Sequence, residues 1–177
     1  MKRLHLSLGL ALLLLVACAP NQDELRKKIT DEEIALSMID IASDDERAQG
    51  LVNLYAQYAD AFPNDSSTVA VYLMKAADVS GNLGDTEEAV HYIDRILEDY
   101  SDACEDIAMC YFLKGHFYEL GERYDDALAA YNAYLELFPD HYLAEDLRKM
   151  LPYIGHPAEE LFEMIMSRAN DKNIVAE

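Results

Sequence analysis

The chain has 177 residues, of which 34 are acidic and 14 are basic, so its formal charge near neutral pH is −20. Nucleic acids and anionic lipid surfaces attract clusters of Lys and Arg, and this negative balance therefore excludes both as main partners. A basic protein partner or divalent cations are compatible with the charge, although solubility alone would also explain it.

The first residues are arranged as in a secretion signal. Lys2 and Arg3 form a short basic start, and an apolar run follows over residues 6–17. The run is too short to span a bilayer comfortably, which takes about 20 apolar residues. We therefore predict that residues 1–17 are a signal peptide. Its removal leaves 12 basic residues against 34 acidic ones, a formal charge of −22, in a mature chain of one domain's length.

The end of this run carries a more specific pattern. It resembles the lipobox of bacterial lipoproteins, in the residues Leu15-Val16-Ala17-Cys18. The resemblance implies cleavage before Cys18 and acylation of that residue, with palmitate among the chains, so the mature protein would be anchored to a membrane without spanning it. Ala19 is not the aspartate that retains enterobacterial lipoproteins in the inner membrane. The resemblance therefore favours the outer membrane, facing the periplasm. The alternative is an ordinary signal peptide cut near a cysteine.

Residues 18–29 are predicted to form a tether, and helix starts follow over residues 30–141. Each start places a capping side chain or acidic residues in the first turn, where they bind free N–H groups and interact favourably with the helix dipole. The four starts are Thr30–Glu33, Ser43–Glu46, Asp85–Glu88 and Asp102–Glu105. Partner helices over about 31–42, 66–82 and 104–120 are predicted upstream of the three apolar stripes described next.

A repeat of 38 residues organises the middle of the chain. Three dipeptides that close helix-like stretches recur at this spacing: Phe62-Pro63, Tyr100-Ser101 and Phe138-Pro139. Apolar stripes at helical spacing superpose under the same shift: Leu51, Leu54, Tyr55 and Tyr58, then Ala89, Tyr92, Ile93 and Ile96, then Ala127, Tyr131 and Tyr134. A period of this length is typical of stacked helical hairpins. We predict three of them, at about 32–65, 70–103 and 108–141, with turns at Gly84 and Gly121.

The period ends after Pro139. Two further apolar patterns predict helices between residues 142 and 169, the second of which opens at Pro157, since proline favours the first helical position. A stack of repeats needs an atypical end that covers its last unit, so these two helices are predicted to form a C-terminal cap. Residues 170–177 are predicted to be a flexible tail.

The third unit resembles the tetratricopeptide repeat. The matching residues are Tyr111, Gly115, Tyr118, Tyr124, Ala127, Tyr131 and Pro139. The second unit matches more loosely, through Leu73, Ala77, Gly84, Ala89, Ile93 and Ile96, and the first mainly through its second helix. The period exceeds the family's usual 34 residues. The resemblance implies an all-α fold: a short right-handed superhelix of about three hairpins plus the C-terminal capping helices.

The same resemblance implies a binding groove along the first helix of each hairpin. Projected onto this chain, the candidate residues are Met74, Asp78, Asn82, Met109, Phe112, His116 and Glu119. Exposed apolar residues flanked by acids suit an extended peptide or a helix with basic flanks. Alternatively, the C-terminal helix over 157–169 buries Met74 and Phe112. These positions hold no lysine, so the carboxylate clamp of chaperone-binding repeats is absent.

Cys104 and Cys110 are the two cysteines besides the lipidation site. Six residues apart on one helix, they would be separated by about 9 Å of rise, which is too far for a disulfide. They could meet only if Cys104 lies in the loop before the helix. The default prediction is two small, separate thiols.

Sequence patterns of catalysis are missing. The chain has no glycine-rich phosphate loop, no zinc-protease or calcium-loop motif and no nucleophile–base pair, so we expect no catalytic residue, metal or other cofactor. The leading hypothesis is a non-enzymatic scaffold that binds an envelope protein in the groove. The alternative is an accessory lipoprotein of an outer-membrane uptake or assembly system that binds a glycan or a peptide through aromatic residues.

Overall fold

The computed structural model describes residues 20–38 and 44–174, and every regular element in these ranges is helical. The elements are α1 (Gln22–Ser37), α2 (Asp45–Ala61), α3 (Ser66–Asn82), α4 (Thr86–Asp99), η2 (Ser101–Ala103), α5 (Ile107–Leu120), α6 (Tyr124–Leu137), α7 (Ala144–Met150), η3 (Leu151–Tyr153) and α8 (Ala158–Ile174). The predicted signal peptide and Cys18 lie outside the described residues.

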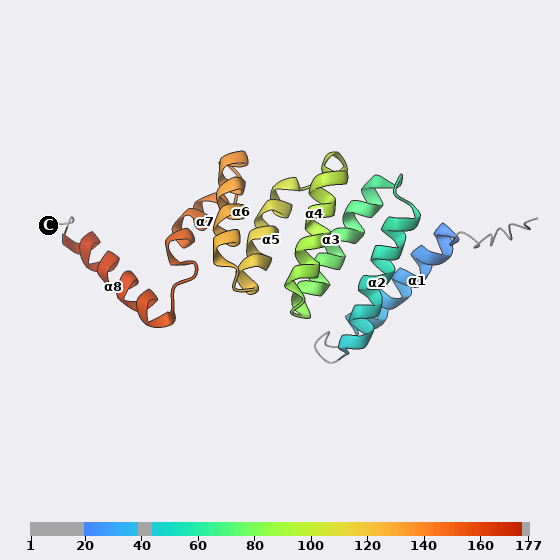
Figure 1. The fold of residues 1–177 in the computed structure, drawn as a ribbon, viewed down its shortest axis with the longest axis horizontal. Coiled ribbons are helices and arrows are strands. Elements are labelled where there is room, and N and C mark those ends of the chain that lie inside the picture. Colours follow the sequence, from blue (N-terminus) through green and yellow to red (C-terminus); the bar gives the residue numbers. More distant parts are fainter. Residues whose placement is uncertain (1–19, 39–43, 175–177) are drawn as a thin grey trace, which may run out of the picture.

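Helices α1 to α6 stack in chain order as three antiparallel hairpins, α1/α2, α3/α4 and α5/α6, each packed against the next (Figure 1). The result is an elongated solenoid of the tetratricopeptide type, which confirms the predicted all-α class. A contiguous core runs from α1 into α5, and a second apolar cluster joins α5 and α6 to α7. Such a stack exposes long faces instead of enclosing a single pocket.

The three predicted apolar stripes form the buried faces of α2, α4 and α6. All eleven residues of the stripes are buried. Their spacing of three and four residues places them on one side of each helix, and each of these helices packs against the helix that precedes it and the helix that follows it in the chain. Aspartates cap three helices: Asp44, Asp85 and Asp106 each accept a hydrogen bond from the backbone N–H three residues later. Much of the negative charge therefore stabilises helix starts.

Helix α1 corrects the predicted tether. Asn21 caps its first turn, with its side chain accepting hydrogen bonds from the N–H groups of Asp23 and Glu24. Leu25 and Ile29 are buried against α2, so residues 22–29 belong to the fold. The predicted start at residues 30–33 lies inside this helix, which ends at Ser37.

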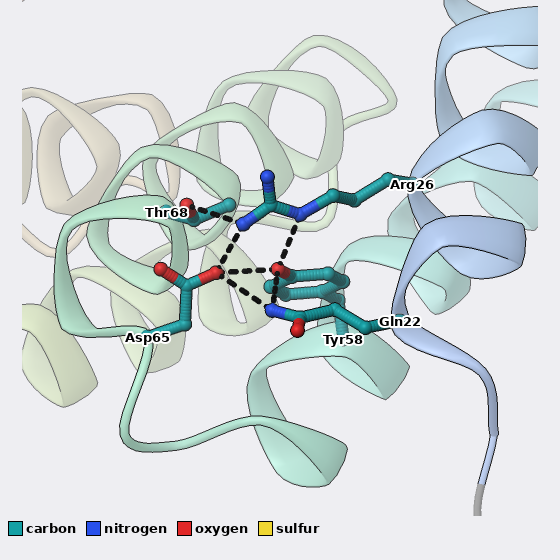
Figure 2. A network of polar contacts seen from close by, with 5 residues as sticks. All are labelled: Gln22, Arg26, Tyr58, Asp65 and Thr68. Carbon is teal, nitrogen blue, oxygen red and sulfur yellow. Dashed lines mark hydrogen bonds and ion pairs between the residues drawn. The ribbon is translucent and has the colours of Figure 1, made fainter.

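A polar network fastens α1 to the loop between α2 and α3 (Figure 2). At its centre is the Tyr58 hydroxyl, which accepts hydrogen bonds from Gln22 Nε2 at 2.8 Å and Arg26 Nε at 2.7 Å and donates one to Asp65. Arg26 also forms an ion pair with Asp65 and donates to the Thr68 hydroxyl. The Tyr58 side chain is fully buried, and the network satisfies its hydroxyl.

The third hairpin repeats part of this arrangement. Two periods after Tyr58, the Tyr134 hydroxyl is hydrogen-bonded to Nδ1 of His141, again seven residues later. In the second unit the corresponding positions are Ile96 and Ala103, which cannot form such a bond. The outer hairpins therefore tie their second helix to the loop that follows it by a polar contact, whereas the middle hairpin relies on apolar packing.

The two hairpin turns use glycine differently. Gly84 adopts the left-handed conformation, with a φ of 84°, as predicted. In the third hairpin that conformation falls on Glu122, with a φ of 57°, and not on Gly121. A Cβ atom on Gly121 would lie 2.6 Å from the Thr86 hydroxyl oxygen. Gly121 is therefore required for the close approach of neighbouring hairpins, and the prediction of its turn conformation is wrong.

The C-terminal region covers the last hairpin only in part. Leu147 of α7 and Ile154 pack onto the cluster around Tyr134. Helix α8 instead extends away from the stack (Figure 1), and Phe162, Ile165 and Met166 are about half exposed or more. The predicted cap is therefore wrong for α8. This helix also continues to Ile174, past the predicted start of the tail. Within the described residues, no helix is both long and apolar enough to cross a bilayer.

Candidate functional site

A groove of about 710 Å³ lies between α3 and α5, the first helices of the second and third hairpins, and we term it the α3–α5 groove. Its walls are the two helices, and one end is formed by the segment that leads into α5. The lining residues are Ser67, Ala70, Val71, Met74, Lys75, Asp78, Ala103, Cys104, Glu105, Asp106, Met109 and Leu113. Successive first helices lie side by side here because the α4 helix packs behind both of them.

The floor of the groove is apolar. Met74, Met109 and Leu113 are half-buried, and Val71 is 51% exposed. Removing apolar surface from water is favourable by about 25 cal/mol per Å² of surface buried. A partner that covers Val71 and the two methionines would recover that energy. Methionine side chains also adapt to partners of different shape.

The rim of the groove is acidic. Asp78, Glu105 and Asp106 line it, together with a single basic residue, Lys75. The Lys75 ammonium donates to Glu33 at 2.7 Å and is therefore already paired with α1. The Asp106 carboxylate accepts the Met109 N–H, and its other oxygen lies 3.7 Å from His141 Nε2. The net field at the rim attracts a cationic group.

The structure divides six of the seven predicted groove residues between two depressions and leaves Asn82 outside both. Met74, Asp78 and Met109 line the α3–α5 groove. Asn82 is exposed at the end of α3, where its amide donates to the Asp78 carbonyl. The other three lie in a second depression, described below. Helix α8 does not line the α3–α5 groove, so Met74 is not buried by it, contrary to the alternative that the sequence left open.

The second depression, of about 790 Å³, lies between α5, α6, α7 and the start of α8, and we term it the α5–α7 hollow. It contains Phe112, His116 and Glu119. The Phe112 ring packs against Tyr131 and Tyr134, with centroids 5.7 and 5.9 Å away, so it belongs partly to the core.

Glu119 is engaged within the fold, because its carboxylate accepts a hydrogen bond from the Tyr131 hydroxyl, with the two oxygens 2.9 Å apart. Burial, and then this hydrogen bond to an anion, raise the pKa of Tyr131 far above its ordinary value. Tyr131 is therefore a neutral donor at every physiological pH. The contact ties α5 to α6, and Glu119 also lines the hollow.

Sequence reasoning missed several residues of the α3–α5 groove. Val71 lies one turn before Met74 on α3 and could have been found by extending the exposed face of that helix backwards. Cys104, Glu105 and Asp106 were assigned to α5, whereas the structure places them before it, with Asp106 as the N-cap. The predicted start of α5 at residues 102–105 is therefore wrong.

The described residues form no cluster of three or more His, Cys, Asp or Glu side chains that could hold a metal ion. Every buried side-chain nitrogen and oxygen in that part of the chain has a hydrogen-bond partner. The α3–α5 groove combines an open apolar floor with charges at its edge, as surfaces that bind another protein chain do.

Comparison with known proteins identifies one segment. The family model of the tetratricopeptide repeat matches residues 109–141, which cover most of α5, all of α6 and the turn after it. Residues 109–141 form a tetratricopeptide repeat. This is the unit in which the signature residues are most complete, and such repeats generally serve as scaffolds for protein–protein interaction. No curated protein and no solved structure matched the chain.

Proposed function

We propose that this protein is a lipoprotein scaffold at the outer membrane, which faces the periplasm and holds an envelope protein in the α3–α5 groove without a reaction of its own. The observation that carries the proposal is the groove itself, with its apolar floor between successive first helices and its acidic rim. The tetratricopeptide repeat at 109–141 supports it, because stacked repeats of this kind present extended binding faces.

The chemistry of the groove selects the kind of partner. One or two apolar side chains, from an extended segment or one face of a helix, would cover Val71, Met74 and Met109. Lys or Arg residues on either side would meet Asp78 and Glu105 at the rim. Charges at a rim mainly raise the association rate and improve specificity, so the affinity would come from the apolar contacts.

Membrane attachment through Cys18 would place the solenoid close to the lipid. Gln22, the first residue of α1, follows Cys18 by four residues, and four extended residues span at most about 14 Å. An attached chain would therefore hold its first hairpin near the membrane surface, while the groove, which belongs to the second and third hairpins, would lie farther along the stack.

Site-specific photo-cross-linking in cells tests the groove. A photoreactive residue at Val71 is expected to form an adduct with a discrete envelope protein. The matched control is Leu137, which is 54% exposed on α6 and does not line the groove. Adducts of the same protein from both positions, or none from Val71, would contradict the proposed groove.

Lipid attachment is tested separately. The full chain is expected to take up a palmitate analogue and to fractionate with membranes, and Cys18→Ser is expected to lose the label. Retention of the label by the variant would rule out Cys18 as the acylated residue.

One observation favours the second candidate, an accessory lipoprotein that binds a glycan or a peptide for an outer-membrane uptake or assembly system. Aromatic rings gather around the α5–α7 hollow: Phe112, Tyr124, Tyr131 and Tyr153. Rings of this kind stack on the apolar faces of sugars. A thermal shift with oligosaccharides that disappears in Tyr124→Ala would favour this function, and no shift with any of them would count against it.

A further inference from the structure

The two cysteines of the described chain meet at one end of the α3–α5 groove. The Sγ atoms of Cys104 and Cys110 lie 3.5 Å apart, close enough for an S–H···S hydrogen bond, and both thiols are free in the structure. Cys110 is fully buried, whereas Cys104 is half-buried and lines the groove. The two cysteines do not lie on one continuous helix, which would have held them too far apart for a disulfide.

The local backbone explains the meeting. Cys104 ends the η2 turn in an extended conformation, with φ −81° and ψ 124°. The chain then turns back through two residues, and Asp106 caps α5. Cys110 lies one turn into that helix, so its side chain points back toward the segment that precedes the helix.

We propose that Cys104 and Cys110 form an intramolecular disulfide when the folded chain meets a disulfide oxidant, such as oxidised glutathione or a protein thiol–disulfide oxidoreductase. The two Sγ atoms need to approach by about 1.5 Å to reach the bond length of about 2.05 Å. Rotation about the Cα–Cβ bonds is the movement that the proposal requires. The bridge closes a short loop that contains the N-cap of α5.

The exchange balances in two steps. The Cys104 thiolate attacks one sulfur of the oxidant's disulfide, giving a mixed disulfide and releasing the other half as a thiolate. The Cys110 proton then passes to the thiolate released in the first step, and the Cys110 thiolate attacks Sγ of Cys104 and displaces the second half. Two protein thiols are oxidised to one disulfide, and the oxidant's disulfide is reduced to two thiols.

The two thiols differ in how readily they attack the oxidant. Burial, and then the neighbouring Cys104, raise the pKa of Cys110 well above its ordinary value, so its thiolate is scarce. Cys104 is also the one in contact with solvent. We therefore assign Cys104 as the attacking thiol and Cys110 as the resolving thiol.

The bridge has a consequence for the groove. One end of it is formed by the segment between α4 and α5, namely Ala103 at the end of η2 and then Cys104, Glu105 and Asp106, which lie before the start of α5. A covalent link from this segment to α5 fixes the segment relative to Met109, the floor residue next to Cys110. The oxidised form therefore holds that end of the groove in one conformation, whether or not a partner is present.

The test uses the full chain with Cys18→Ser, in which only the two cysteines of interest remain. The folded protein is equilibrated with reduced and oxidised glutathione, and the free thiols are then alkylated. Both cysteines fall in one tryptic peptide, 96–114, because no Lys or Arg lies between Arg95 and Lys114. The expected product is this peptide without alkyl groups or glutathione and lighter by two hydrogen atoms.

Two comparisons make the result decisive. The equilibrium constant for bridge formation against glutathione is expected to be roughly tenfold or more higher in the folded chain than in urea, because the fold holds the sulfurs together. In Cys110→Ser, Cys104 is expected to retain one glutathione. Equal constants in the folded and unfolded chains, or two alkylated or separately glutathionylated cysteines in the folded chain, would overturn the proposal.

Discussion

Single tyrosines carry much of the specificity of this fold. Tyr58 is fully buried, and its hydroxyl is shared among groups from α1, α2 and the start of α3 (Figure 2). A buried hydroxyl without partners would cost about 1–3 kcal/mol, so the network fixes α1 in one position on the stack. Tyr134 and His141 play the corresponding part in the third hairpin.

The network predicts how stability depends on pH. The hydrogen bond from Tyr58, followed by those from Arg26 and Thr68, lowers the pKa of Asp65 below its ordinary 3.8. The ionised form is thus favoured in the folded state, and its contribution is complete above about pH 5 and lost as the pH falls through the lowered pKa. We expect Asp65→Asn to reduce the unfolding free energy near pH 6. This reduction should become progressively smaller as the pH falls below 4, which urea titrations at a series of pH values would measure.

Asp31 provides the matched control for that experiment. It pairs with Lys27 one turn away on the same helix, and both side chains are mostly exposed. Such a pair contributes about 0.3–0.5 kcal/mol at most. Asp31→Asn should therefore follow the pH profile of the wild type closely. A profile of Asp65→Asn that runs parallel to the wild type down to pH 2 would contradict the role given to Asp65.

At the scale of elements, the contact between the two helices of a hairpin depends on residue size. A Cβ atom on Gly115 would lie 2.5 Å from the Tyr131 ring, whereas one on Gly50, in α2, would meet nothing within 4 Å. We expect Gly115→Ala to destabilise the protein by about 1–3 kcal/mol through overpacking. Gly50→Ala should stabilise it by about 0.5–1 kcal/mol through helix propensity. Urea denaturation measures both, and equal effects would refute the close contact.

The two C-terminal helices should differ in their importance for stability. Leu147 of α7 is 3% exposed, and Phe162 of α8 is 66% exposed. We expect Leu147→Ala to cost about 2–4 kcal/mol of unfolding free energy and Phe162→Ala to cost less than about 0.5 kcal/mol. Thermal denaturation of the two variants checks this. A large loss in Phe162→Ala would mean that α8 packs against the stack in solution.

The buried stripes of α2, α4 and α6 could be predicted from the sequence because a 38-residue period and helical spacing restrict the same positions. The start of α1 could not, because only Leu25 and Ile29 mark its buried face among charged residues, and the cap at Asn21 is a weak signal. The start of α5 was predicted too early, because Asp102 resembles a helix cap. In the structure the short helix η2 comes first, and the residue that caps α5 is Asp106.

The candidate site was predicted only in part, for a geometric reason. The family resemblance implies one continuous groove along the first helices. On α5, however, Met109 and Leu113 lie one turn apart and face α3, whereas Phe112, His116 and Glu119 lie on a neighbouring face that the α5–α7 hollow adjoins. Which of these faces stays open depends on where α7 packs, and the sequence pattern of the repeat does not contain that information.

At the scale of the whole molecule, the protein is a short solenoid with a strongly negative charge, and its α3–α5 groove has an open, apolar floor. The charge is distributed over helix starts and exposed faces, so it directs cationic partners toward the stack without defining a site by itself. We therefore expect specific binding to depend on the groove floor and to be weakened strongly by a single charge placed there.

The role of the groove floor is tested by a peptide-display selection against the folded protein, with Val71→Asp and Leu137→Asp selected in parallel. We expect the wild type and Leu137→Asp to enrich the same peptides, in which apolar residues are flanked by Lys or Arg. Binding of these peptides to Val71→Asp should be at least about tenfold weaker, which corresponds to about 1.4 kcal/mol. Enriched peptides that bind all three proteins equally, or that are acidic, would contradict the account.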